Sequence, residues 1–184
     1  MVIVSRFPQP PATIREALNV MQVIRSGDRE AIAELGDITD PPRPWDPASC
    51  PPELREQLWR WCDGVATWVN EEYSWRPGSL IPSCWPRHRH IANELAVLAC
   101  LRDAATEPTS PPELLEEWHR HTLPLFLDRM ATRLGESSCR TGTHQDWPAA
   151  SRYESFTSGA PARQDLFHVD THPPRQLRPT AVSR

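Results

Sequence analysis

The sequence contains no lysine, and all 20 of its basic residues are arginine. Together with abundant alanine and 21 prolines, this usage is typical of a protein from a GC-rich genome, such as that of an actinobacterium. The 24 acidic residues bring the net charge to −4. The composition therefore provides no overall electrostatic attraction for nucleic acid or for an anionic membrane.

Long apolar runs and secretion features are also missing. No apolar stretch is long enough to cross a bilayer, and the first residues lack the basic start of a signal peptide. The five cysteines are odd in number and show no spacing typical of a disulfide framework, which indicates reduced thiols. We therefore expect a cytoplasmic protein that does not associate with membranes.

Glycine is scarce, with only 7 residues, and neither a phosphate-binding glycine loop nor a nucleophile elbow is present. We accordingly expect a protein that is not an enzyme. Apolar residues make up 39% of the chain, which predicts a small core joined by stiff proline-rich connectors. Eight tryptophans can supply much of that core.

Apolar residues recur at helical spacing and show no strand-like alternation, so the fold class is predicted to be all-α. Thr13 with Glu16 resembles a capping box, and Asp28 can cap a short second helix. Residues 1–39 are thus predicted to be an N-terminal helical pair. Six prolines between Asp40 and Pro52 then predict a semi-rigid linker over residues 40–51.

Residues 52–137 are predicted to be a small domain of about three packed helices. The first begins at Pro52 and ends near Tyr73, and the second begins near Pro86. The apolar residues that we expect to face inward from the second helix are Ile91, Leu95, Leu98 and Leu101.

The third helix is predicted to begin after Ser110, to be kinked near His121 by Pro124, and to end at Gly135. Its expected inward stripe is Leu114, Trp118, His121 and Leu125, with Leu115, Phe126, Met130 and Leu134 beside it. Residues 138–184 are polar and are predicted to be a largely disordered tail, with at most one short helix before Gly159.

A scattered set of metal-ligating residues could assemble one tetrahedral zinc site if the third helix meets the loop before the second. The members are Cys84, His88, His119, Cys139 and His144. The spacing contains no compact Cys-x2-Cys pair, so we favour buried thiols and helix-capping histidines, with no cofactor. Structural zinc is the alternative. A Cys/His nucleophile is disfavoured because no oxyanion-forming context surrounds either cysteine.

Aromatic and basic residues meet at the start of the second helix, in a pattern that can grip single-stranded nucleic acid or a protein partner. The candidate binding residues are Trp59, Arg76, Trp85, Arg87 and Arg89. Trp59 lies off the apolar stripe of the first helix, so it is a candidate anchor for a protein partner.

Five segments together resemble a family of small actinobacterial proteins of unassigned function, often encoded on plasmids and other mobile elements. The segments are Trp68-Val69-Asn70, residues 80–88 (Leu-Ile-Pro-Ser-Cys-Trp-Pro-Arg-His), residues 93–98 (Asn-Glu-Leu-Ala-Val-Leu), Glu117-Trp118-His119, and Cys139 with His144. The resemblance covers about residues 58–145. It implies a non-enzymatic helical accessory protein of a mobile genetic element, and it supplies no catalytic residues.

The sequence therefore predicts an adaptor that acts through protein–protein contacts, with an unidentified protein as partner. The alternative is a nucleic-acid-associated accessory factor that uses the Arg/Trp patch, and a zinc-binding helical protein is the third interpretation.

Overall fold

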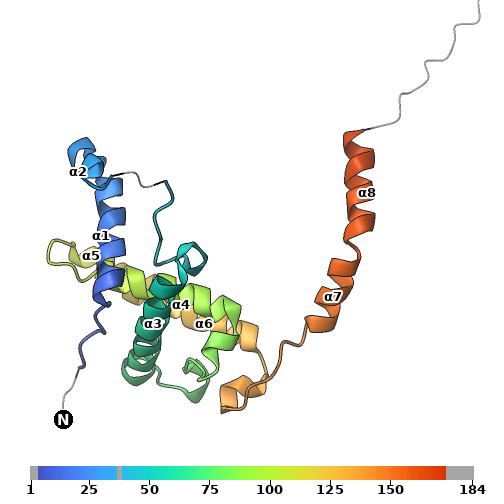
Figure 1. Cartoon of the computed structure of the whole chain (residues 1–184). Coiled ribbons are helices and arrows are strands. Elements are labelled where there is room, and N and C mark those ends of the chain that lie inside the picture. The colour runs from blue at the N-terminus through green and yellow to red at the C-terminus, as the bar shows by residue number, and fades with distance from the viewer. Residues whose placement is uncertain (1–3, 37–38, 173–184) are drawn as a thin grey trace, which may run out of the picture. The chain divides into compact units, whose positions relative to one another are not determined.

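A computed structural model of the chain describes residues 4–36 and 39–172, and these form helices and no strand (Figure 1). The predicted all-α class is confirmed. The chain divides into two compact units, Met1–His144 and Gln145–Arg184. The helical elements of the first unit are α1 (Ala12–Ser26), α2 (Arg29–Glu34), η1 (Pro47–Ser49), α3 (Pro52–Glu72), η2 (Pro77–Ser79), η3 (Trp85–Arg87), α4 (Arg89–Ala104), α5 (Pro112–Glu117), η4 (Trp118–Thr122), α6 (Leu123–Leu134) and η5 (Ser138–Thr141).

The second unit contains α7 (Ala150–Ser158) and α8 (Ala160–Thr171). Continuous helix from Ala160 to Thr171 differs from the disorder that we predicted beyond Gly159. Gly159, with a negative φ of −79°, does not form the left-handed turn that often ends a helix. Its N–H donates to the carbonyl of Ser155 and its carbonyl accepts from the N–H of Arg163, so helical hydrogen bonds continue on both sides of it. Residues 173–184 of the predicted tail lie outside the described residues.

The N-terminal segment packs directly on α3. Phe7 is buried and meets the Trp68 ring edge to face, with the ring centroids 5.1 Å apart. The indole N–H of Trp61 donates to the carbonyl of Pro8 at 2.8 Å. The described residues 4–36 therefore belong to the same unit as the helices that follow.

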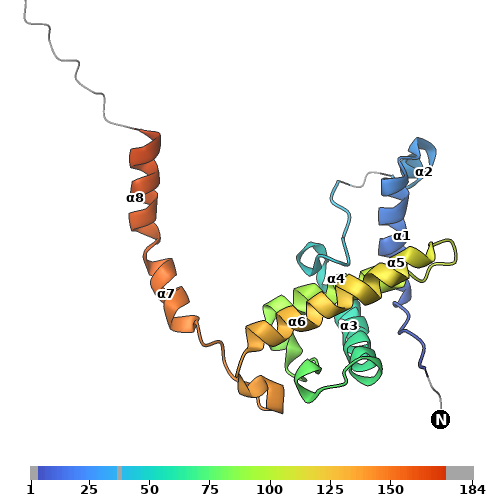
Figure 2. The ribbon, with the colours of Figure 1, turned by 180° about the vertical axis from the view of Figure 1, so that it is seen from behind.

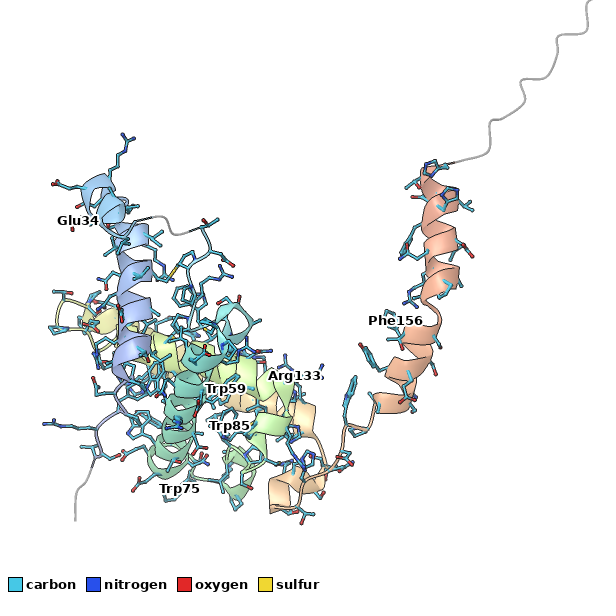
Figure 3. The ribbon with its side chains drawn as sticks, viewed as in Figure 1. Glu34, Trp59, Trp75, Trp85, Arg133 and Phe156 are labelled. Atoms are coloured by element: carbon cyan, nitrogen blue, oxygen red, sulfur yellow. The ribbon has the colours of Figure 1, made fainter. Side chains whose placement is uncertain are left out.

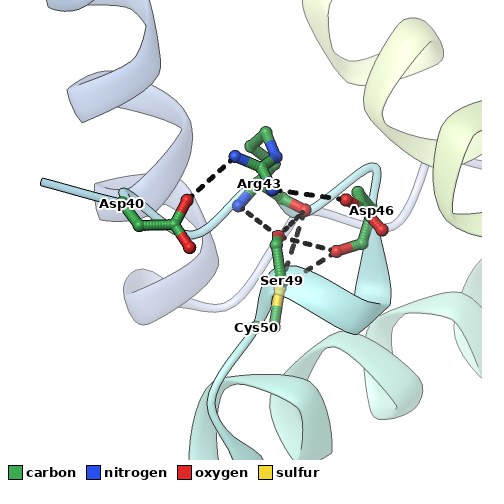
Figure 4. A network of polar contacts seen from close by, with 5 residues as sticks. All are labelled: Asp40, Arg43, Asp46, Ser49 and Cys50. Carbon is green, nitrogen blue, oxygen red and sulfur yellow. Dashed lines mark hydrogen bonds and ion pairs between the residues drawn. The ribbon is translucent and has the colours of Figure 1, made fainter.

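The proline-rich segment 40–51 folds into a local turn instead of an extended spacer. The Ser49 hydroxyl accepts from the backbone N–H of Arg43 at 2.8 Å and lies 2.7 Å from the carbonyl of Asp46. The Arg43 guanidinium pairs with Asp40 and Asp46, and Cys50 beside them is 2% exposed (Figure 4). These contacts satisfy backbone N–H and carbonyl groups of the turn, and Cys50 at its end packs into the core.

Aromatic rings form the centre of the core, and they enclose a cation. The Arg102 guanidinium lies 5.3 to 5.5 Å from the ring centroids of Phe7, Trp68 and Trp118. Such contacts stabilise a partly desolvated guanidinium by about 1–2 kcal/mol. Leu101 beside it, which we expected to face inward, is 47% exposed.

The third helical segment runs from α5 to α6 as one rod, interrupted by the single π turn η4 (Figure 2). Pro124 has no N–H to donate and its ring would clash with the carbonyl four residues earlier, so the helix widens instead of kinking sharply. The extra residue moves the buried face by one position. Trp118 is buried as expected, whereas Leu125 is 50% exposed and Phe126 is 2% exposed. The expected stripe through Leu114, His121 and Leu125 was wrong.

Glu94 links α4 to α6 through ion pairs with Arg129, at 2.7 Å, and with Arg133. Partial burial would raise the pKa of the Glu94 carboxyl, but the hydrogen bonds from the two guanidinium groups outweigh it and lower that pKa. The pairs therefore stabilise the fold above the ordinary carboxyl pKa, and this stabilisation is lost as the pH falls through the lower folded value.

We expect Glu94→Gln to reduce the free energy of unfolding at pH 7 by about 1 kcal/mol, since both arginines remain nearly half exposed. Urea denaturation at pH 7 and at about pH 3 would measure the change. Both series need a chelator, so that metal binding does not contribute. The exposed Glu71 provides a control, since Glu71→Gln should change the free energy by less than about 0.5 kcal/mol. A Glu94→Gln deficit that persists at pH 3 would contradict this account.

Candidate metal centre

Cys84 and His88 lie on either side of η3, just before α4. The turn is set by backbone bonds from the Trp85 N–H to the carbonyl of Pro82, 2.9 Å, and from the His88 N–H to the carbonyl of Trp85, 3.0 Å. Pro86 occupies the first turn of η3, where its missing N–H leaves no bond unmade. As a result the Cys84 Sγ and the His88 Nε2 are 3.4 Å apart.

Cys139 and His144 form the second half of the site, just after α6. Gly135 ends α6 with a φ of 52°, and Cys139 follows in η5 with only 2% of its surface exposed. Gly142 adopts a left-handed φ of 96°, which turns the chain back after η5. The Cys139 Sγ and the His144 Nδ1 are then 3.7 Å apart.

Packing of α4 against α6 brings the two halves together. The bonds from Trp118 to Leu98 at one end and from Arg129 to Glu94 further along show that α4 and α6 run antiparallel. The start of α4 therefore lies beside the chain that leaves α6. One ligand atom from each of Cys84, His88, Cys139 and His144 lies within 4.8 Å of all the others.

The Cys–His separation within each half of the site fits a tetrahedral zinc ion. With Zn–S near 2.3 Å and Zn–N near 2.0 Å, the edges of an ideal tetrahedron are about 3.3 to 3.8 Å. The two Cys–His distances of 3.4 and 3.7 Å fall in that range. Among the common metals, zinc is the one that two thiolates and two imidazoles in a tetrahedral arrangement favour.

Burial and neighbouring groups shift the pKa values of Cys84 and His88. Burial and the neighbouring Cys139 raise the pKa of the Cys84 thiol. Burial, followed by His144 and His90, lowers the pKa of His88. The imidazole is thus in the neutral form that binds metal, and a bound cation would stabilise both thiolates. A nucleophilic cysteine requires a lowered thiol pKa, so the shift in Cys84 argues against that role.

His119, the fifth predicted ligand, does not belong to this cluster. It lies on the π turn, where its ring packs against those of Tyr73 and Trp118, at centroid distances of 5.7 and 5.2 Å. The remaining cysteines, Cys50, Cys62 and Cys100, are buried in the core. Burial raises the pKa of each of these thiols, to about 12 for Cys100, so they are inert packing groups.

The structure places two of the five candidate binding residues together. Trp59 of α3 meets Trp85 of η3 with ring centroids 6.0 Å apart. Arg87 and Arg89 are exposed on either side of His88, and Arg76 is exposed at the start of η2.

Sequence reasoning overlooked Asp63, which accepts a hydrogen bond from the Trp85 indole at 3.2 Å. Its spacing of four residues from Trp59 places both on one face of α3 and could have revealed it.

Comparison of the chain with protein-family models, with curated proteins and with solved structures finds no match. The resemblance to a mobile-element family therefore stays a prediction. Among the residues that the structure describes, no helix is long and apolar enough to span a bilayer.

Proposed function

We propose that this chain is a non-enzymatic helical protein that acts by binding another protein. We further propose that one zinc ion stabilises its fold. The observation that carries the metal assignment is the convergence of two cysteines and two histidines from two separate segments within 4.8 Å. The ion would join the start of α4 to the segment after α6, and so close a loop of about 50 residues. Closing such a loop removes conformational freedom from the unfolded chain.

The donor set supports a structural role for the metal. Four protein ligands complete the tetrahedral coordination of zinc, and no position is left for substrate or activated water. Catalytic zinc sites keep three protein ligands and one open position.

Action through a protein partner is supported by the aromatic side chains at the surface of the first unit. Trp75 is 95% exposed, and Trp59 is partly exposed beside the metal-bearing turn. We also propose that three helices pack together with an N-terminal helical pair. The protein would serve as an accessory factor of a mobile genetic element. Nucleic-acid binding through Arg76, Arg87 and Arg89 is the second candidate, favoured by their exposure but opposed by the net charge of −4.

Metal analysis of the purified full-length chain tests the proposal. We expect about one zinc ion per chain after exhaustive dialysis, and loss of helical signal when a strong chelator removes it. Substitution with Co²⁺ should give the visible absorption bands of a tetrahedral thiolate complex. Less than about a tenth of an equivalent of zinc after refolding in zinc-containing buffer would refute the metal centre.

A further inference from the structure

An open hollow of about 440 Å³ lies between α3, η3 and the first turn of α4, within the first unit. Trp59, Trp85 and Pro86 form its apolar wall, and Glu56, Arg60 and Asp63 form its polar rim. Its volume lies within the usual range for ligand-binding clefts. The metal centre does not use any of these side chains.

The aromatic wall is held in a fixed geometry. The Trp59 and Trp85 rings meet at 62° with centroids 6.0 Å apart (Figure 3). Trp85 is only 4% exposed, and its indole N–H donates to a carboxylate oxygen of Asp63 at 3.2 Å. Asp63 is itself exposed, so a charged acceptor is positioned at the edge of the aromatic surface.

The charges around the hollow favour a cation. The lining contains two carboxylates and one guanidinium, that of Arg60, which pairs with Glu56. The side chains of that pair are 69% and 61% exposed, and such exposed pairs are weak enough for an incoming group to replace. Within the described residues, Asp63 forms no ion pair, so its charge remains available to a ligand.

We propose that this hollow binds an arginine side chain of a protein partner. A planar guanidinium can stack on the Trp59 ring while it donates two hydrogen bonds to the Asp63 carboxylate. A lysine ammonium is more strongly hydrated and cannot make the stacked, forked contact. A phosphate backbone would be repelled by the two carboxylates. The inference rests on the proposed function, because it identifies what the protein partner presents.

The metal centre would set the geometry of this pocket. Cys84 and His88 lie directly before and after η3, which carries Trp85 and Pro86 of the wall. A zinc ion bound to both ligands would therefore fix the position of the wall relative to α3.

Titration of the zinc-loaded full chain with a capped Gly-Arg-Gly peptide, followed by ¹H–¹⁵N NMR of the indole groups, tests the proposal. We expect saturable shifts of the Trp59 and Trp85 signals, with a dissociation constant of about 1 mM, as befits a single side-chain contact. The matched peptide with citrulline has the same shape without the charge, and it should bind at least about tenfold more weakly. Equal shifts with both peptides, or no shift with arginine, would overturn the proposal.

Variants of the pocket separate charge from shape. Asp63→Asn keeps an acceptor for the Trp85 indole but removes the charge, and it should weaken arginine binding about tenfold. Trp147→Ala removes an exposed tryptophan that does not line the hollow and should leave binding unchanged. Unaltered affinity in Asp63→Asn would overturn the proposal. So would a single-stranded oligonucleotide that shifts Trp59 and Trp85 where the peptide does not.

Zinc content, measured on the same samples, separates the two proposals. If the chain holds about one zinc ion but does not bind the arginine peptide, only the pocket assignment is refuted. A chain without zinc that still binds the peptide, with the Asp63→Asn effect intact, would refute the metal centre alone.

Discussion

Cys139→Ser is expected to abolish tight zinc binding and to lower the free energy of unfolding in zinc-containing buffer by about 4 kcal/mol. The magnitude follows from mass action: a ligand present at about a thousand times its dissociation constant stabilises the folded state by that amount. Removal of one of four ligands weakens a structural site by orders of magnitude, because the remaining three leave the ion open to water and chelators. Cys139 is 2% exposed, so the site loses its most buried thiolate.

Paired denaturation curves isolate the metal contribution from packing. Wild type and Cys139→Ser are compared once in excess zinc and once in excess chelator. In chelator they should differ by no more than about 1 kcal/mol, the cost of a buried serine hydroxyl, so most of the deficit appears only with zinc. His119→Ala is the informative control, since His119 lies outside the cluster and its variant should retain the metal. A Cys139→Ser chain that holds zinc as tightly as wild type would contradict the centre.

The contrast between His119 and the four clustered residues shows where sequence reasoning reached its limit. Cys–His spacing of four or five residues identified each half of the site correctly as a local pair. Convergence of the halves depends on the antiparallel packing of α4 and α6, and no local pattern encodes that packing. His119 was included on the expectation that the third helix meets the loop before the second, but its ring packs against Tyr73 and Trp118 instead.

Local signals predicted several helix ends, because they act within a few residues. The capping box at Thr13 was wrong, since α1 begins at Ala12 after Pro11 and has no side-chain cap. Asp28 accepts from the N–H groups of Glu30 and Ala31, Pro52 begins α3, and Gly135 ends α6. The proline-rich segment was misjudged for the opposite reason. Its structure comes from polar contacts between side chains and backbone, centred on Arg43 and Ser49, that composition alone does not reveal.

The second large expected effect is a difference in the free energy of unfolding between Phe126→Ala and Leu125→Ala, and it depends on the register of α6. An uninterrupted α-helix that begins from the buried Trp118 would direct position 125 inward, seven residues on. The π turn inserts one residue, which rotates the following helix by about 100° and directs position 126 inward instead. The buried positions that result are Leu123, Phe126, Met130 and Leu134.

Each of these buried positions lies one residue beyond the position that the uninterrupted helix would bury, so the two substitutions test the π turn directly. Phe126→Ala should lower the free energy of unfolding by about 3–5 kcal/mol, as loss of a buried aromatic ring usually does. Leu125→Ala, at a side chain that is half exposed, should cost less than about 1 kcal/mol. Chemical denaturation in zinc-containing buffer measures both. Reversed costs would show that α6 keeps an ordinary helical register, in which case the segment after α6 would leave the helix on a different side. The pairing of Cys139 and His144 with Cys84 and His88 would then also have to be abandoned.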